Sequence, residues 1–208
     1  MEYTENTAMG CVIMASGRAV RFGSNKLLAD FGSAPLIARA LDVTETPALA
    51  ARVVVTRSPE VAELACKAGV KTILHSLPGR NDTVRLGLEA LLSELPGLAG
   101  CIFLPGDQPL LRKESLEAMA RDFSALDEKE RAILRLGFRA EDGTERLGSP
   151  VLFGSSYFGA LCSLAEGKGG GVVIRRHPES VRAVYAVRQE ELEDADTVEE
   201  LERLRKLL

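Results

Sequence analysis

Short apolar runs alternate with longer amphipathic segments along most of the chain. Four runs in the first half are apolar almost throughout, which predicts strands covered on both faces of a sheet. These strands are expected at residues 10–15, 52–56, 70–75 and 101–104. Segments with apolar residues at helical spacing predict helices at 35–43, 58–68, 82–95 and 112–123, the second of them capped by Ser58 and opened by Pro59.

The second half of the chain has a less regular pattern. It predicts strands at 132–138, 150–153 and 182–187, helices at 157–164 and 197–207, and surface loops at 127–131 and 141–143. We expect mixed strand directions there. The alternation of strands and helices as a whole is typical of an α/β fold, with helices packed on a mostly parallel sheet.

Size and composition narrow the class of protein. A chain of 208 residues with 46% hydrophobic and 27% charged content is expected to form one domain. Its net charge of −4 argues against a general nucleic-acid binder. No leader is visible and no apolar run is long enough to span a membrane, so no membrane partner is expected. The four cysteines are far apart and are expected to be buried thiols in a reducing cytoplasm.

Residues 15–28, Ala-Ser-Gly-Arg-Ala-Val-Arg-Phe-Gly-Ser-Asn-Lys-Leu-Leu, follow the first strand and suit a triphosphate. Small residues let backbone N–H groups approach phosphate oxygens, and basic residues add positive charge. The small residues are Ala15, Ser16 and Gly17, and the basic ones are Arg18, Arg21 and Lys26. The spacing fits neither a Walker loop nor a dinucleotide-binding glycine fingerprint. A solvent-exposed turn with hydrated basic residues is the alternative interpretation of this loop taken alone.

The fourth strand leads directly into Asp107, within Pro105-Gly106-Asp107-Gln108-Pro109. Open α/β sheets bind ligands at the carboxyl ends of their strands. One or two carboxylates at that edge, completed by phosphate oxygens and waters, are enough to hold Mg²⁺. Taken alone, Asp107 is better explained as a turn aspartate. Together with the basic loop, it is expected to bind the metal.

These two segments resemble the MobA-like NTP transferases, in which a strand ends in small residues followed by Arg-Phe/Met-Gly and Lys-Leu, and in which a strand end binds metal. The resemblance implies a three-layer, Rossmann-like nucleotidyltransferase fold with a mixed, mostly parallel central sheet. It divides the domain into a nucleotide-binding half, 1–110, and an acceptor-binding half, 111–208. It also implies that Gly17 and its neighbours hold the NTP while Arg21 and Lys26 grip its phosphates during transfer.

Two further segments resemble parts of the same family. Asp194-Ala195-Asp196-Thr197 is similar to an Asp-Ile-Asp-Thr sequence, which implies a second metal or active-site carboxylate at Asp194 or Asp196; alternatively, it is an acidic start of a helix. Residues 79–88 resemble a Gly-x-x-x-Ser-x-x-x-Gly-Leu segment over the nucleotide, which implies binding roles for Gly79 and Thr83. The same residues could begin an ordinary helix capped by Asn81 or Asp82.

Residues 148–153, Gly-Ser-Pro-Val-Leu-Phe, resemble an acceptor-facing segment of the molybdenum cofactor cytidylyltransferase branch, with Ser149 in place of its histidine. That branch also has a Gly-Asp-x-Gly turn, which appears here as residues 167–170 with Lys168 replacing the acid. Both departures bear on which acceptor the protein uses more than on its fold or the class of reaction. His75 and His177 have no metal-ligand spacing and are expected to be structural or exposed.

The resemblance implies magnesium-dependent transfer of a nucleoside monophosphate from an NTP, with CTP as donor, to a phosphorylated acceptor, with molybdopterin as the example. A molybdoenzyme or its chaperone would then be the downstream partner. Guanylyl transfer to the same cofactor and cytidylyl transfer to a sugar or polyol phosphate share the same loop and Asp107. A nucleotide-binding regulatory or chaperone-like module without turnover remains the alternative of a different class, and a dinucleotide-dependent hydride transferase is disfavoured by the missing fingerprint.

Overall fold

The computed structural model describes residues 8–17, 22 and 25–208 of the chain. Within these residues, seven strands form one sheet in the order β3-β2-β1-β4-β6-β5-β7. The strands are β1 (Met9–Ala15), β2 (Ala51–Thr56), β3 (Lys71–Leu74), β4 (Gly100–Pro105), β5 (Ile133–Arg139), β6 (Glu145–Gly154) and β7 (Val181–Tyr185). β6 runs antiparallel to its neighbours β4 and β5, and the other pairings are parallel. The predicted mixed, mostly parallel sheet is confirmed.

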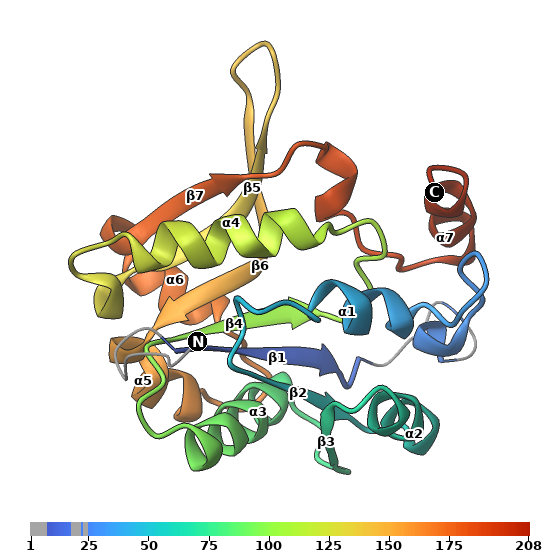
Figure 1. Cartoon of the computed structure of the whole chain (residues 1–208), viewed down its shortest axis with the longest axis horizontal. Coiled ribbons are helices and arrows are strands. Elements are labelled where there is room, and N and C mark those ends of the chain that lie inside the picture. Colours follow the sequence, from blue (N-terminus) through green and yellow to red (C-terminus); the bar gives the residue numbers. More distant parts are fainter. Residues whose placement is uncertain (1–7, 18–21, 23–24) are drawn as a thin grey trace.

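Helices cover both faces of this sheet (Figure 1). They are α1 (Ile37–Val43), α2 (Pro59–Lys67), α3 (Arg80–Glu94), α4 (Lys113–Ser124), α5 (Phe158–Cys162), α6 (Gly171–Arg176) and α7 (Val198–Arg205). The apolar sides of α1, α2, α4 and α7 belong to one hydrophobic cluster, and those of α3, α5 and α6 belong to the other. This arrangement confirms the three-layer α/β fold. Within the described ranges, no helix has the length and hydropathy needed to cross a bilayer.

The central strands β1 and β4 are apolar on both sides because both of their faces are buried. In β1, Cys11 and Ile13 point into one cluster and Val12 into the other. Gly87 lets α3 approach the sheet closely, because a Cβ at this position would lie 2.4 Å from a methyl carbon of Val12. A continuous apolar run in the sequence thus becomes a central strand that serves two cores.

Three elements differ from the sequence prediction. β6 begins at Glu145 instead of residue 150, because its polar first residues pair with β5 in a hairpin that projects from the body in Figure 1. α6 was not predicted, because it is short and follows a glycine-rich run. The predicted caps of α3, Asn81 and Asp82, are wrong: Gly79 is the N-cap, and the Asp82 carboxylate accepts a hydrogen bond from the Gly79 N–H at 3.0 Å.

The order of strands creates a crevice beside β1. From β1 the chain continues to β2 and β3 on one side, and then returns to place β4 on the other side. The loops that follow β1 and β4 therefore diverge at the carboxyl edge of the sheet, which is where open α/β folds bind ligands. Ser16 and Gly17 follow β1 at this edge, and Asp107 follows β4.

Candidate functional site

Lys26 lies between two carboxylates at this crevice. It begins a 3₁₀ turn, Lys26–Leu28, which is capped by the Asn25 side chain. The Lys26 Nζ atom lies 2.5 Å from Asp107 Oδ2 and 2.7 Å from Asp196 Oδ1. The structure thus brings together three predicted site residues from three distant parts of the chain.

A backbone hydrogen bond holds the segment that contains Asp194 and Asp196 next to Asp107. The Ala195 N–H donates to the Asp107 carbonyl at 2.9 Å, which fixes the Asp194–Asp196 segment against the end of β4. The following helix, α7, begins with a capping box: Thr197 Oγ1 accepts from the Glu200 N–H, and Glu200 Oε2 accepts from the Thr197 N–H. The acidic segment is therefore both the start of a helix and part of the site.

The charges at the crevice shift one another's pKa values. Burial opposes the charge on Lys26, but its interactions with Asp107 and Asp196 outweigh burial and raise the pKa of the ammonium group. Partial burial, followed by repulsion from Asp107 and Asp196, raises the pKa of Asp194 to about 6, although a hydrogen bond from Gln108 opposes the shift. Among the described residues, Asp107, Asp194 and Asp196 all interact with the Lys26 ammonium group.

The donor set suits a hard divalent cation. Asp107, Asp194 and Asp196 offer carboxylate oxygens, which Mg²⁺ prefers. Burial is the main cause of the raised pKa of Asp194, and a cation would offset the smaller contribution from repulsion by Asp107 and Asp196. In the part of the chain that the structure describes, no group of three His, Cys, Asp or Glu side chains is close enough to enclose a metal unaided. A magnesium ion would accordingly need phosphate oxygens and waters to complete its shell.

These carboxylates face a cavity of about 460 Å³. Its lining brings together predicted nucleotide, metal and acceptor residues, namely Ser16, Gly17, Gly79, Thr83, Asp107, Ser149, Asp194 and Asp196. A Cβ added to Gly17 would meet no described atom within 4 Å, so the backbone there is open to an incoming group. Ala15 is buried, and its carbonyl accepts from Thr56 Oγ1 at 3.1 Å, so it supports the loop without lining the cavity. Arg18 and Arg21 lie outside the described residues.

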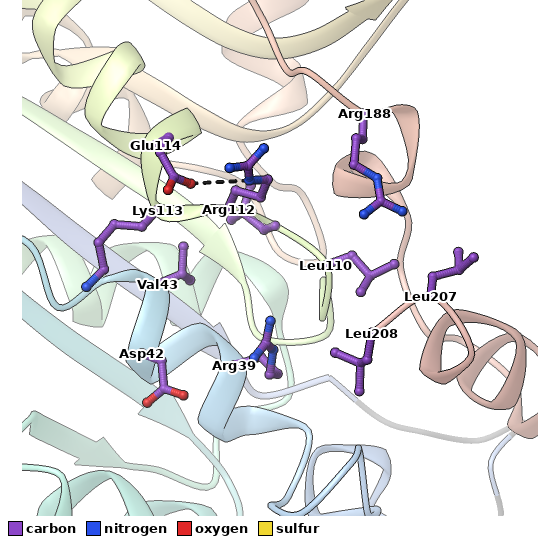
Figure 2. Close-up of a pocket in the computed structure, with 11 residues that line it drawn as sticks. Arg39, Asp42, Val43, Leu110, Arg112, Lys113, Glu114, Arg188, Leu207 and Leu208 are labelled. Carbon is purple, nitrogen blue, oxygen red and sulfur yellow. Dashed lines mark ion pairs between the residues drawn. The ribbon is translucent and has the colours of Figure 1, made fainter.

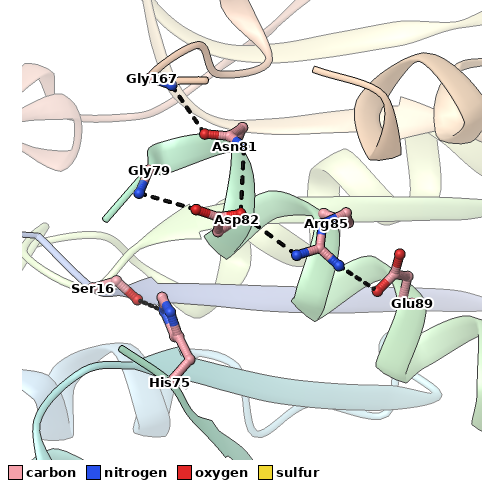
Figure 3. Close-up of polar contacts among 8 residues, drawn as sticks. All are labelled: Ser16, His75, Gly79, Asn81, Asp82, Arg85, Glu89 and Gly167. Carbon is pink, nitrogen blue, oxygen red and sulfur yellow. Dashed lines mark hydrogen bonds and ion pairs between the residues drawn. The ribbon is translucent and has the colours of Figure 1, made fainter. Parts of the chain in front are cut away.

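Ser16 connects the first strand end to two residues that sequence analysis left outside the site. The Ser16 hydroxyl donates to the Val55 carbonyl at 3.0 Å, so it accepts from His75 Nε2 at 2.8 Å (Figure 3). The Arg57 guanidinium donates to the Ser16 carbonyl. Burial and the charge of Arg57 lower the pKa of His75, so the imidazole is neutral at pH 7.

Arg57 and His75, which sequence analysis did not place in the site, share one feature of the sequence. Arg57 follows β2 and His75 follows β3, so both lie at the same carboxyl edge as Asp107. Applying the strand-end rule to every parallel strand would have found them. His177 differs: its ring packs against Tyr157, with centroids 5.1 Å apart, and it lines neither the crevice nor the cavity.

The N-terminus of α3 forms the opposite wall. Gly79 and Thr83 line the cavity there, and Thr83 is buried. Asn81 Oδ1 accepts a hydrogen bond from the Gly167 N–H at 3.0 Å, as Figure 3 shows. This contact joins the predicted nucleotide segment to the glycine-rich turn 167–170.

A separate cavity of about 390 Å³ has more basic than acidic side chains in its lining. It is lined by Arg39 of α1, by Arg112 and Lys113 at the start of α4, and by Arg188 (Figure 2). Arg112 is already paired with Glu114 at 3.3 Å. None of the predicted site residues within the described ranges lines this cavity, so the candidate site is the one at Lys26.

Comparisons with known proteins agree with the α/β fold described above. The family described as the MobA-like NTP transferase domain matches residues 11–181. The fold is similar to that of Rv0371c from Mycobacterium tuberculosis, at 23% identity and a TM-score of 0.73, with 96% of this chain and 99% of that chain covered. Rv0371c also has a crystal structure as a complex with manganese.

Two further solved structures share the fold. A nucleotidyl transferase from Methanothermobacter has a TM-score of 0.78 at 19% identity, with 96% of this chain and 97% of that chain covered. A CMP:2-keto-3-deoxy-manno-octonic acid synthetase complexed with CTP has a TM-score of 0.74 at 16% identity, with 96% and 98% covered. Since the family match spans most of the sequence and the fold agrees with it, this chain belongs to the MobA-like NTP transferase family.

Proposed function

We propose that this protein transfers a nucleoside monophosphate from an NTP, with CTP as the first candidate, to a phosphorylated acceptor, with molybdopterin as the first candidate, and releases pyrophosphate. The observation that carries this proposal is the position of Lys26, between Asp107 and Asp196 at the crevice and beside a cavity lined by Ser16 and Gly17. Residues 1–110 would bind the nucleotide and residues 111–208 the acceptor. We place the reaction in the cytoplasm.

The reaction needs no protein nucleophile. An acceptor phosphate oxygen attacks the α-phosphorus of the NTP and forms the new P–O bond. The bond from the α-phosphorus to the bridging oxygen breaks, and pyrophosphate leaves with that electron pair. Two unit charges about 4 Å apart repel by roughly 4 kcal/mol at an effective dielectric of 20, so the protein's main task is to position and neutralise anions.

The residues of the site divide this task. Lys26 supplies a positive charge, and its ammonium group would turn from its carboxylate partners toward the triphosphate. Backbone N–H groups near Ser16 and Gly17 can donate to phosphate oxygens, and Arg57 fixes the Ser16 carbonyl so that the loop keeps its shape. We also propose phosphate contacts for Arg18 and Arg21, nucleotide contacts for Gly79 and Thr83, and an acceptor contact for Ser149.

A divalent metal is part of the proposal, with magnesium as the first candidate. Asp107 would hold it, assisted by Asp196 or Asp194, and the ion would supply charge neutralisation at the transferred phosphoryl group. The manganese complex of Rv0371c supports a divalent ion in this fold. Of the two helix-side carboxylates, Asp196 is the stronger candidate, because it already shares the Lys26 cation with Asp107.

The choice of donor and acceptor rests on sequence and on similar folds. The CTP complex of the similar synthetase supports a cytidine nucleotide. Molybdopterin is supported by the likeness of residues 148–153 to the molybdenum cofactor cytidylyltransferase branch, and a molybdoenzyme or its chaperone would then receive the product. Ser149 lines the cavity where this segment would meet an acceptor.

The experiment tests CTP, GTP, ATP and UTP with magnesium and one acceptor at a time, either purified molybdopterin or a sugar or polyol phosphate, with pyrophosphate release as the readout. We expect release with CTP and molybdopterin together, and its loss in Asp107→Asn. Release with GTP only would show that GTP, and not CTP, is the donor. Release with a sugar or polyol phosphate only would show that this compound, and not molybdopterin, is the acceptor. Thermal stabilisation by an NTP without release from any pair would identify a binding module and refute the transferase.

A further inference from the structure

The cavity lined by Asp107 and Asp196, the two partners of Lys26, adjoins a second cavity of about 360 Å³. The two share three lining residues, Met14, Arg80 and Ser149. Beyond Ser149, the second cavity extends between β6, β5 and the segment Gly167–Gly171 that leads into α6. If the nucleotide occupies the first cavity, as proposed above, the second cavity offers adjoining space for the acceptor.

The second cavity has an unbalanced positive charge. Four basic side chains line it, namely Arg80, Arg135, Lys168 and Arg175, and no Asp or Glu is among its described lining residues. None of the four forms an ion pair with another described residue. Arg135 is half-buried and donates only to the backbone carbonyls of Leu147 and Gly148, at 3.0 and 3.3 Å. This half-buried charge therefore lacks a partner of opposite sign.

The glycine-rich turn is built to present Lys168 at this cavity. A Cβ on Gly169 would lie 2.9 Å from Arg80 Cδ, and a Cβ on Gly170 would lie 3.0 Å from the Phe153 ring. The turn packs closely between Arg80 and the aromatic floor, and side chains at Gly169 and Gly170 would displace these neighbours. The hydrogen bond from Gly167 to Asn81 fixes this turn relative to the nucleotide side.

The charge exceeds what one phosphate requires. Arg80 lines both cavities and can serve the phosphate that attacks the nucleotide, whereas Arg135, Lys168 and Arg175 line the second cavity alone. A monoester phosphate carries at most two negative charges, and the attacking one must lie at the Ser149 end. Three more cations beyond it leave a separate positive subsite, over an apolar floor that includes Phe103, Val151 and Phe153.

We propose that the acceptor carries a second anionic group besides its attacking phosphate, and that Arg135, Lys168 and Arg175 bind this second group. This inference rests on the proposed function. It defines the acceptor class as a small molecule with two negatively charged ends separated by a short spacer that contacts the apolar floor. Lys168 is then a specificity residue at the position where the similar branch has an acid.

The test uses matched probes that differ in one anionic group. The wild-type protein is saturated with magnesium and a non-transferable α,β-methylene CTP, or the GTP analogue if that binds instead. Phosphoglycerate is then compared with glycerol phosphate, and fructose bisphosphate with fructose monophosphate, by calorimetry. We expect at least one doubly anionic probe to bind about tenfold or more tightly than its partner, the size of effect that charge-assisted hydrogen bonds produce. The two pairs distinguish a carboxylate from a second phosphate.

Lys168→Gln should remove most of that preference, and Lys206→Gln is the matched control, because Lys206 is exposed and lines neither cavity. Equal binding within both pairs, including no binding by any probe, overturns the second anionic subsite. A preference that survives in Lys168→Gln also overturns the assignment. Failure of both nucleotide analogues to bind is a different result, since it refutes the proposed function itself.

Discussion

Replacing Lys26 with Met should lower the free energy of unfolding, because Asp107 and Asp196 then lose the cation that they share. Only 11% of the Lys26 side chain and 19% of the Asp107 side chain are exposed, whereas Asp196 is exposed over 51%. Breaking a buried ion pair from one side costs about 3–5 kcal/mol, and the exposed pair adds at most about 1 kcal/mol. Because Asp107 retains some contact with solvent, we expect a loss of about 3 kcal/mol in the free energy of unfolding.

The assay is urea denaturation of four proteins in a double-mutant cycle: wild type, Lys26→Met, Asp107→Asn and the combination. The double variant has neither charge, so it should lose at least about 1 kcal/mol less than the sum of the single variants. Additivity within about 0.5 kcal/mol would show that the two groups do not interact, and it would refute the reasoning.

Lys67→Met is the control for ion-pair geometry without burial. Lys67 Nζ lies 2.6 Å from Glu63 on α2, but both side chains are more than half exposed, at 69% and 66%. Its removal should change the free energy of unfolding by less than about 0.5 kcal/mol.

The double variant of Lys26 and Asp107 also separates stability from catalysis. It should regain stability but not pyrophosphate release, because loss of one electrostatic group lowers the rate by about 10²–10³-fold.

Three further outcomes are expected. Asp194 is exposed as a residue, so screening limits the cost of its raised pKa to about 1 kcal/mol. Because its folded pKa of about 6 lies above the ordinary 3.8, the protonated form stabilises the fold below pH 3.8 and this contribution is lost as pH rises through 6. Asp194→Asn should therefore exceed wild type in urea midpoint at pH 8 but not at pH 3.5; an equal gain at both values would contradict this. Gly87→Ala should cost about 1–3 kcal/mol by overpacking Val12, whereas Gly159→Ala, with open space around it, should cost nothing in thermal denaturation. Ser16→Ala should raise the NMR-measured pKa of His75, because more water reaches the imidazole, and an unchanged titration would show that the contact does not matter.

Sequence patterns predicted the fold best where both faces of a strand are buried. β1, β2 and β4 are mainly apolar and buried, and both ends of each were predicted to within one residue. The start of β6 was not predicted, because its polar residues give no hydrophobic pattern. The helix α6 was not predicted, because it is short and glycines precede it. Local patterns cannot report elements whose stability comes from partners elsewhere in the chain.

The site was predictable to the same extent. Lys26 and Asp107 could be placed together because each follows a parallel strand, and the structure joins them. The hydrogen bond from Lys26 to Asp196 joins residues 170 positions apart in the sequence and depends on how α7 packs. The sequence therefore could not show whether Asp194 or Asp196 pairs with Lys26. The basic lining beyond Ser149 was visible only as a lysine in place of an acid at residue 168.

The most direct test of the account is a crystal structure of the protein with α,β-methylene CTP and magnesium. The account predicts the triphosphate in the cavity between Gly17 and Gly79, with a phosphate oxygen within hydrogen-bond distance of Lys26 Nζ and the metal on Asp107. A triphosphate bound instead among Arg39, Arg112 and Arg188, with Lys26 still enclosed by its two carboxylates, would contradict it.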